Sequence, residues 1–421
     1  MVAIAPRRVL AAITLLVVGG LVASCTGATP ASSPSSSASV SSTVEPNDGA
    51  TVDEFSPLVV STVVGDPIPV RGTDDLYHVV YELEVLNASP RPARIDSVVS
   101  SAGGDEIASL RGDEVVARTI PIGDYPFPPE AVSQIPAGTT AVILMDTTFA
   151  SLADVPEQIE QTISATFGDV REGQANYAHL FPTEAVARAV TPVGSGHPVV
   201  VGPPLEGSDW VAVNACCTLS PHRGSMIPIG GRINASERYA IDWSRFDLTR
   251  PLVENGAQST FSGDPTDNAD YFTYDQPVLA VGDGEVAAVV DDLPDAEPHV
   301  LQEDLPLNDY GGNHVVLKLS EGVYAFYAHL KPGSTTVEVG DRVELGDEIA
   351  RTGNSGNTTE SHLHFHVMDG VAPLTSTNLP FEISSFEMIG TGSDDGSEFI
   401  RDEGARESEL PLILSAIGFP E

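Results

Sequence analysis

Three histidines alternate with apolar residues along one short stretch of the chain. His362, His364 and His366 lie in the segment 361–367, which has the sequence SHLHFHV. Alternate residues of a β-strand share a face, so the sequence predicts that the three imidazoles point to one side while the apolar residues between them enter the core. Imidazole is the commonest zinc ligand, and several on one face can bind a metal ion or move protons. The pattern alone leaves open whether these histidines form a metal site or a solvated face.

Two other apolar stretches each carry one residue of a kind that binds metals or moves protons. The segment 325–330, AFYAHL, holds His329 just before a Lys-Pro-Gly turn, and the segment 238–243, RYAIDW, holds Asp242. A carboxylate and imidazoles brought together from separate strands make a usable site for a hard-to-borderline cation. The sequence therefore predicts a cation site that several strands assemble.

Short motifs follow one another in the order found in lysostaphin- and LytM-type metallopeptidases. They are ID at 241–242, GDGEV at 282–286, YAHL at 327–330, GDRV at 340–343, GNSGN at 353–357 and HLHF at 362–365. Over roughly residues 200–380 the chain resembles this family of zinc endopeptidases, and several motifs in family order are more specific than any one alone. The resemblance implies a small all-β domain in which antiparallel sheets form a central cleft.

The resemblance also implies a role for each matching residue. Asp242 and His364 match two zinc ligands, His362 matches the histidine that accepts a proton from the attacking water, and His329 matches the histidine that supports the oxyanion. Zinc activates water at neutral pH and polarises a peptide carbonyl, and a neutral imidazole can then take the proton.

One family ligand is missing from this sequence. The family has a histidine four residues before the aspartate, where this chain has Arg238, and a guanidinium cannot ligate zinc. His222 and the pair Cys216 and Cys217 lie just upstream and are the candidates to replace it. We expect His222, because an exposed cysteine would tend to oxidise in an exported protein.

Two further departures leave alternatives open. His366 stands where the family has a glutamate, and it is a candidate for a further ligand or for a partner of one. Adjacent cysteines can pair only in a strained ring. Cys216 and Cys217 can therefore be buried small residues, a redox-labile pair or metal ligands, and the sequence does not decide among them.

Two functions are compatible with these residues. We expect a zinc metalloendopeptidase, a hydrolase that cuts peptide bonds in peptidoglycan during cell-wall remodelling. The alternative, which the missing ligand favours, is a non-catalytic module that binds cell-wall peptides or regulates a wall hydrolase. A lipoyl-like carrier domain is disfavoured, because neither glycine-turn unit, at 277–286 or 337–347, contains the lysine that such a domain presents.

The N-terminus has the features of an export signal. Arg7 and Arg8 precede an apolar run at 9–23, which is short for a membrane span and typical of a signal peptide. Cys25 follows small residues directly after this run, as in a bacterial lipobox. We expect a lipoprotein signal peptide at 1–24, lipidation of Cys25, and a location at the outer face of the cytoplasmic membrane, in the cell envelope.

The rest of the chain divides by composition and is expected to be all-β. Residues 25–51 are rich in Ser, Pro and Thr and predict a disordered tether. Residues 52–190 show alternating short strands that predict an immunoglobulin-like sandwich. Residues 195–390 form the metallopeptidase-like domain, and residues 391–421 are expected to be an acidic tail.

Charge limits the possible partners. The chain has 20 Lys and Arg against 60 Asp and Glu, a formal net charge of −40. Such a chain has no basic patch for phosphates, which excludes nucleic acid as an expected partner. Anionic lipid headgroups would repel it, so membrane attachment must be covalent or inserted. Peptidoglycan peptides and a lipid anchor are the expected partners, and the oligomeric state is left open.

Overall fold

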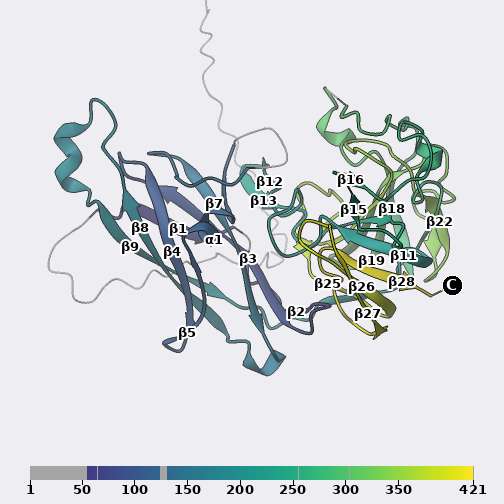
Figure 1. Cartoon of the computed structure of the whole chain (residues 1–421), viewed down its shortest axis with the longest axis horizontal. Helices are drawn as coiled ribbons and strands as arrows, with labels where there is room; N and C mark the ends of the chain where they lie inside the picture. The colour runs from purple at the N-terminus through teal and green to yellow at the C-terminus, as the bar shows by residue number, and fades with distance from the viewer. Residues whose placement is uncertain (1–54, 64, 124–129, 255, 303, 421) are drawn as a thin grey trace, which may run out of the picture. The chain divides into compact units, whose positions relative to one another are not determined.

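The computed structural model describes residues 55–63, 65–123, 130–254, 256–302 and 304–420 (Figure 1). The predicted signal peptide, tether and lipidation site at Cys25 lie outside these residues. All described residues belong to one compact unit, Ser42–Glu421. None of the helices in the described part of the chain is long and apolar enough to cross a membrane.

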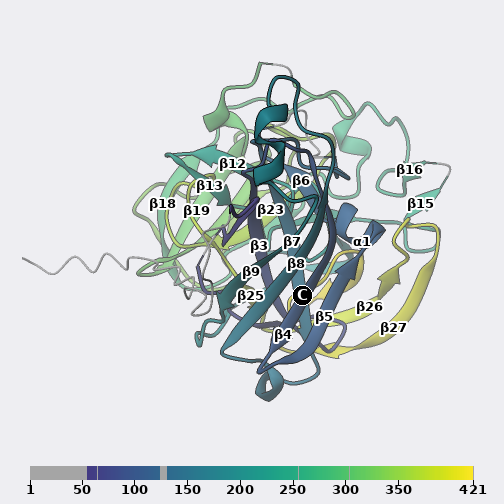
Figure 2. The same cartoon turned by 90° about the vertical axis from the view of Figure 1, so that its left-hand side faces the viewer.

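The N-terminal part consists of two antiparallel sheets that share one core (Figure 2). One sheet has the order β1-β3-β7-β6, with β2 on β3; its strands are β1 (Leu58–Thr62), β2 (Val70–Arg71), β3 (Tyr77–Asn87), β6 (Thr119–Pro121) and β7 (Thr140–Phe149). The other has the order β5-β4-β8-β9, with β4 (Ala93–Ala102), β5 (Asp105–Arg111), β8 (Gln158–Phe167) and β9 (Glu184–Pro192). Three short helices connect strands, α1 (Asp113–Val116), η1 (Leu152–Asp154) and η2 (Ala175–Leu180).

The alternating pattern in this region buries the apolar face of the strands, as predicted. Tyr81 and Leu83 of β3 and Ile163 of β8 are fully buried in the shared core. Part of the opposite face of β3 is also buried, including the polar residues His78 and Glu82, whereas Leu86 near the end of the strand is exposed. Residues of the C-terminal part cover part of that face, as the contacts of Glu82 described below show. The structure therefore supports a two-sheet sandwich in which the face of β3 turned away from the sandwich core is partly covered by the C-terminal part.

The C-terminal part is built around an eleven-stranded sheet. Its order is β21-β18-β19-β20-β23-β14-β11-β28-β26-β27, with β24 on β23. The strands are β11 (Gly207–Val213), β14 (Ile241–Arg245), β18 (Gly284–Val290), β19 (Asn313–Ser320), β20 (Val323–Leu330), β21 (Arg342–Val343), β23 (Leu363–Met368), β24 (Asn378–Leu379), β26 (Phe386–Gly392), β27 (Phe399–Arg406) and β28 (Ser415–Phe419).

Small two-stranded sheets and two short helices complete this part. The pairs are β10 (Val199–Val201) with β25 (Phe381–Ile383), β12 (Met226–Ile229) with β13 (Arg232–Ala235), β15 (Val253–Glu254) with β16 (Ala257–Gln258), and β17 (Pro277–Leu279) with β22 (Glu348–Arg351). The short helices are η3 (Asn268–Asp270) and η4 (Leu307–Asp309). The described part of the chain is thus almost all β, as predicted.

The segment that the sequence places in an acidic tail is part of the large sheet. β28 lies between β11 and β26 and pairs with both in antiparallel register. Its residues Ala416 and Ile417 are fully buried. The apolar residues of β28 thus form an inner strand of the sheet, whereas the expectation of an acidic tail followed the acidic residues before them.

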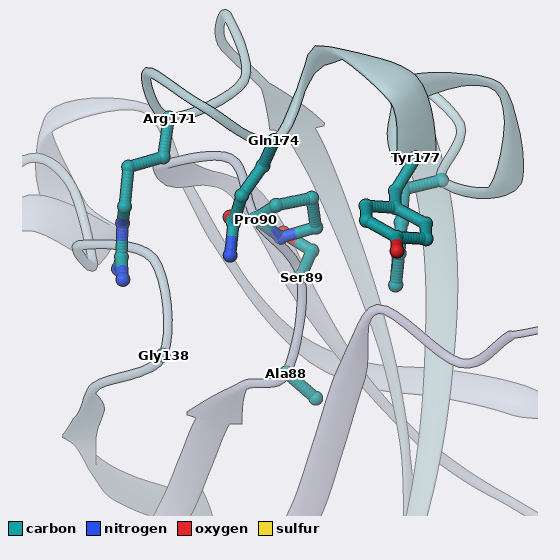
Figure 3. A pocket seen from close by; sticks show the side chains of 8 residues that line it. Ala88, Ser89, Pro90, Gly138, Arg171, Gln174 and Tyr177 are labelled. Carbon is teal, nitrogen blue, oxygen red and sulfur yellow. The ribbon is translucent and has the colours of Figure 1, made fainter.

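The N-terminal sandwich also contains a cavity of about 300 Å³ (Figure 3). It is lined by Ala88, Ser89, Pro90, Gly138, Arg171, Gln174, Tyr177 and Phe181. None of the residues predicted to carry chemistry is among them.

Candidate metal centre

Three neighbouring strands of the large sheet bring the predicted site residues together. β14, β23 and β20 are adjacent, and Asp242 of β14 lies directly opposite His364 of β23. His364 in turn lies opposite Ala328 of β20. The apolar residues Leu363 and Phe365 are fully buried on the other face. The predicted strand with its alternating faces is therefore confirmed.

His329 reaches the same side of the sheet by a local break in the alternation. Because Ala328 faces His364, a regular strand would turn His329 to the opposite face. His329 instead has a backbone φ of 61°, in the left-handed region that few non-glycine residues adopt. Its backbone N–H donates to Gly311 O at 2.9 Å, and its ring centroid lies 4.6 Å from that of His362. An uncommon backbone conformation at this position thus turns the side chain into the site.

Three imidazoles surround the carboxylate of Asp242. Its Oδ1 lies 3.0 Å from His364 Nδ1 and 3.3 Å from His362 Nε2. Its Oδ2 lies 3.3 Å from His222 Nε2 and accepts a hydrogen bond of 2.8 Å from Asn214 Nδ2. No Lys or Arg of the described residues forms an ion pair with Asp242. Among the described residues, every ion-pair partner of this carboxylate is an imidazole.

His222 belongs to this cluster, whereas Arg238 does not. One ligand atom each of His222, Asp242 and His364 lies within 4.8 Å of the others, and all three residues are buried. Arg238, at the position of the missing family histidine, pairs instead with Glu82 of the N-terminal sandwich. The structure therefore places the predicted substitute His222 beside the other two predicted ligands.

Hydrogen bonds to backbone carbonyls fix the orientation of three of the histidines. His222, His329 and His362 each have Nδ1 within bonding distance of a carbonyl oxygen, which can only accept. The acceptors are, in the same order, Ala240 at 3.2 Å, Ser355 at 2.8 Å and Glu360 at 2.8 Å. Each Nδ1 therefore carries a proton, and in the neutral ring Nε2 has a free lone pair. A metal ligand is commonly held in this way.

His364 is held through its Nε2, and not its Nδ1, by the ring of His366. His364 Nε2 lies 2.9 Å from His366 Nδ1, which leaves His364 Nδ1 to face Asp242. His366 Nε2 is buried and has no hydrogen-bond partner among the described residues. Of the two roles left open by the sequence, the structure favours a partner of a ligand for His366, because it contacts His364 and lies outside the group of His222, Asp242 and His364.

Burial and mutual contact set the charges of these groups. Burial alone would raise the pKa of Asp242, but His222 and His362 hold it well below its usual value. Burial lowers the pKa of His222, and the carboxylate of Asp242 more than offsets this and raises it to about 9. Burial, together with His362 and His364, holds the pKa of His329 well below its usual value. A negative carboxylate thus lies among imidazole nitrogens, an arrangement in which a divalent cation can replace protons.

This donor set fits zinc. Two imidazole nitrogens and one carboxylate oxygen are a known catalytic zinc ligand set, which leaves a fourth position for water or substrate. His222 Nε2, Asp242 and His364 Nδ1 supply these atoms, and their other polar atoms are held by hydrogen bonds. The residues present therefore match the ion that the sequence predicts.

The two cysteines are not part of this donor set. Cys216 and Cys217 form a disulfide with each other and are both buried in the core, so neither sulfur is a thiolate ligand. A second group, His78, Asp146 and Cys217, also has ligand atoms within 4.8 Å of one another. The His78 ring, however, bonds to two carboxylates and the Cys217 sulfur is in the disulfide. That group is therefore an ion pair beside a disulfide.

Comparisons with known proteins find similarity to metallopeptidases. Residues 269–375 match the model of Peptidase family M23. An uncharacterized metalloprotease of Buchnera aphidicola subsp. Baizongia pistaciae (strain Bp) is 28% identical over 91 residues, which are 22% of this chain and 19% of that protein. The chain therefore spans about a fifth of the length of this curated relative.

Solved structures of peptidases are also similar. The catalytic domain of the antimicrobial peptidase lysostaphin from Staphylococcus simulans is 24% identical, over 31% of this chain and 81% of its own, with a TM-score of 0.19. LytU is 28% identical, over 28% of this chain and 77% of its own, with a TM-score of 0.19. The segment matched by the family model contains His329, His362 and His364. By the family model, the C-terminal part of the chain contains, across residues 269–375, a segment that matches peptidase family M23.

Proposed function

We propose that this protein is a zinc metalloendopeptidase that hydrolyses peptide bonds in peptidoglycan. The observation that carries the proposal is the grouping of His222, Asp242 and His364 next to two further histidines whose Nε2 atoms turn to the same place. A domain that only bound peptides would need neither a metal donor set nor a second pair of oriented imidazoles. This arrangement favours an enzyme over the non-catalytic alternative.

The two remaining histidines would move protons. Zinc, when bound, supplies a Lewis acid that activates water and polarises a peptide carbonyl. His362 is placed to accept a proton at Nε2, because its Nδ1–H is donated to a carbonyl. His329 likewise has its Nδ1 bonded to a carbonyl, so its Nε2 turns toward the same place, and the family resemblance makes it the group that supports the oxyanion. We assign His362 as the acceptor and His329 as the stabilising group.

The substrate class rests on the resemblance to lysostaphin-type enzymes and on the export signal. An exported, lipid-anchored protein of the cell envelope meets peptidoglycan, and the strongly acidic chain requires a covalent anchor to stay at an anionic membrane. The proposed ligand for the site is therefore a peptide of the cell wall.

A direct assay tests the function. Purified protein should hold about one zinc ion per chain, and zinc-loaded protein should release new amino termini from purified peptidoglycan. A chelator should stop this release, and added zinc should restore it. If zinc-loaded protein releases none and still sediments with peptidoglycan, the module is a binding protein and the proposal of an enzyme is wrong.

The lipid anchor is tested separately. Intact-mass analysis of membrane-extracted protein should show an acylated Cys25 as the N-terminus, and Cys25→Ala should release the protein from the membrane fraction. A wild-type protein that is fully soluble and unmodified would exclude the anchor and leave the proposed catalysis unaffected.

A further inference from the structure

A charged residue of the N-terminal sandwich is completely buried against the C-terminal part. Glu82 lies on β3, on the face that does not contribute to the core of the sandwich, and has 0% exposure. Two arginines reach it, Arg223 with 0% exposure and Arg238 with 4%. A buried carboxylate requires such partners, because an uncompensated charge in the interior is very costly.

The two guanidinium groups share the carboxylate in a directional arrangement. Arg238 donates from Nε to Glu82 Oε1 at 2.9 Å and to Oε2 at 3.2 Å, and its Nη2 pairs with Oε2. Arg223 pairs with Oε1 through Nη1 and donates from Nη2 to the carbonyl of Met145 on β7 at 3.3 Å. Burial alone would raise the pKa of Glu82, but the two arginines lower it to about 2. The carboxylate is therefore charged at neutral pH and holds both arginines in fixed directions.

The two arginines belong to the two segments whose relative position determines where His222 lies. Arg223 directly follows His222, and Arg238 precedes Ala240 by two residues. The hydrogen bond that orients His222 runs from its Nδ1 to the carbonyl oxygen of Ala240, at 3.2 Å. Glu82 thus joins the segment of His222 and Arg223 to the segment of Arg238 and Ala240, and the same two segments are also joined by the hydrogen bond that orients His222.

A second chain of hydrogen bonds ties the same loop to Asp242. The backbone N–H of Arg223 donates to Ser220 Oγ at 3.2 Å, and that hydroxyl donates to the carbonyl of Asn214 at 3.0 Å. Asn214 Nδ2 donates to Asp242 Oδ2 at 2.8 Å. The loop that carries His222 is therefore fixed on one side by Asp242 and on the other by Glu82.

We infer that the N-terminal sandwich completes the metal centre, with Glu82 as a positioning residue that holds His222 in place through Arg223 and Arg238. The inference rests on the proposed zinc site. It assigns a role to the first domain, which contributes no ligand of its own, and it accounts for the arginine at position 238, whose side chain is used to hold the loop. Partners that orient a metal ligand typically change metal affinity by 10–100-fold when they are removed.

Two variants of the full-length chain test the inference. Glu82→Gln keeps the size of the side chain and removes its charge. The triple variant Glu82→Met, Arg223→Met, Arg238→Met removes all three charges, and such apolar replacement of a buried ionic group often preserves stability. The matched control is Gln161→Met, which removes a buried polar group of the same sandwich that bonds to Tyr81 Oη at 3.0 Å.

Each protein is examined by three measurements. Competition with a chromophoric chelator gives the zinc affinity, the visible absorption of the Co²⁺-loaded protein reports the geometry of the ligands, and thermal unfolding of the metal-free protein gives the stability. We expect Glu82→Gln and the triple variant to bind zinc about 10–100-fold more weakly with an altered Co²⁺ spectrum. Gln161→Met should keep the affinity and the spectrum of the wild type, even if it lowers the unfolding temperature.

The outcomes separate this inference from the proposed function. A wild-type chain that binds no zinc overturns both. A wild-type chain that binds zinc, with a folded triple variant or Glu82→Gln that binds it equally well, overturns only the role of Glu82. Equal loss of affinity in Gln161→Met would show that general destabilisation of the sandwich is responsible, and would also overturn that role.

Discussion

At the scale of single residues, the site is defined by which nitrogen of each histidine is already occupied. Backbone carbonyl oxygens accept hydrogen bonds from Nδ1 of His222, His329 and His362. His364 instead has its Nε2 within hydrogen-bond distance of His366 Nδ1. These contacts leave one ring nitrogen per histidine for chemistry. A ligand and a proton acceptor have the same side chain here. His222 and His362 both lie 3.3 Å from Asp242, and what distinguishes them is that His222, and not His362, belongs to the group with Asp242 and His364 whose ligand atoms lie within 4.8 Å of one another.

The ligand role of His222 predicts a large effect on metal binding. His222→Ala should weaken zinc binding by at least about 100-fold, because loss of an orienting partner alone costs 10–100-fold. Loss of His364 should abolish binding. Affinity is measured by chelator competition, with His314→Ala on β19 as a control, since His314 lies outside the ligand group. Unchanged affinity in His222→Ala, with loss in His366→Ala, would move the third ligand to His366.

The proton-accepting role of His362 predicts a loss of rate without a loss of metal. A positioned general base typically contributes 10²–10⁴-fold, so His362→Ala should lower turnover by about that factor while zinc stays bound. His329→Ala should lower turnover by a similar order through lost charge stabilisation. The two are compared by release of amino termini and by zinc content measured on the same samples. Zinc-free His362→Ala protein would show that His362 is a ligand, contrary to this assignment.

At the scale of elements, strands place the residues and loops adjust them. β14, β23 and β20 set Asp242 and His364 opposite each other by register alone. His329 depends in addition on two glycine-containing segments, around Gly312 and Gly356, that lie against each other and supply Gly311 O and Ser355 O as its hydrogen-bond acceptors. Gly312 and Gly356 both have positive φ, and a Cβ at Gly356 would lie 2.3 Å from Gly312 N. This close approach places the carbonyl of Ser355 where it accepts the His329 Nδ1–H.

This close approach predicts that Gly356→Ala impairs catalysis through His329. The added Cβ must push the two segments apart and move the Ser355 carbonyl, so turnover should fall at least about 10-fold while zinc is retained. Gly333→Ala is the matched control, because Gly333 also has a positive φ of 68° but has no atom within 4 Å of the added Cβ. Gly333→Ala should lose about 1 kcal/mol of stability through its positive φ alone, and Gly356→Ala should lose more, because its Cβ also meets the backbone of Gly312. Equal turnover in the two variants would show that the close approach does not affect His329.

At the scale of the whole molecule, one face of β3 carries two buried ionisable groups, Glu82 and His78. Glu82 pairs with arginines of the C-terminal part, and His78 on the same face of β3 lies between two carboxylates. Its Nδ1 is 3.0 Å from Asp146 Oδ1 and its Nε2 is 3.1 Å from Asp74 Oδ1. Burial lowers the pKa of His78, but the two carboxylates raise it to about 10. The folded chain therefore holds a proton there that the unfolded chain releases near the usual pKa of 6.5.

This difference predicts how stability depends on pH. Because the folded-state pKa lies above the unfolded one, the contribution of His78 is fully present below pH 6.5 and is lost as the pH rises through 10. The gap in the free energy of unfolding between wild type and His78→Gln should therefore shrink by on the order of 2 kcal/mol between pH 6 and pH 10, a figure reduced for the partly exposed Asp74. Urea unfolding at several pH values measures this gap. The exposed His179→Gln is the control, and a gap that stays constant for His78→Gln would contradict the assignment of charge.

The local pattern of the sequence determined much of the site. Period-two alternation predicted β3, β8 and β23, because a strand that buries one face must alternate. It placed His364 on the same face of the strand as His362 and His366. The short motifs around Asp242, His329 and His362 indicated the metallopeptidase fold. These features depend on neighbours within a few residues, so one chain is enough to predict them.

Only the tertiary structure decided the remaining features, because each depends on residues far apart in the sequence. His222 joins Asp242 and His364 through a loop whose position depends on Glu82, 140 residues earlier. Part of the polar face of β3 is buried because arginines of another segment complement its charge, and composition carries no sign of such pairing. β28 enters the middle of the sheet because its apolar residues fit between β11 and β26. His329 points into the site against the strand alternation, since a backbone turn held by Gly311 and Ser355 reverses it.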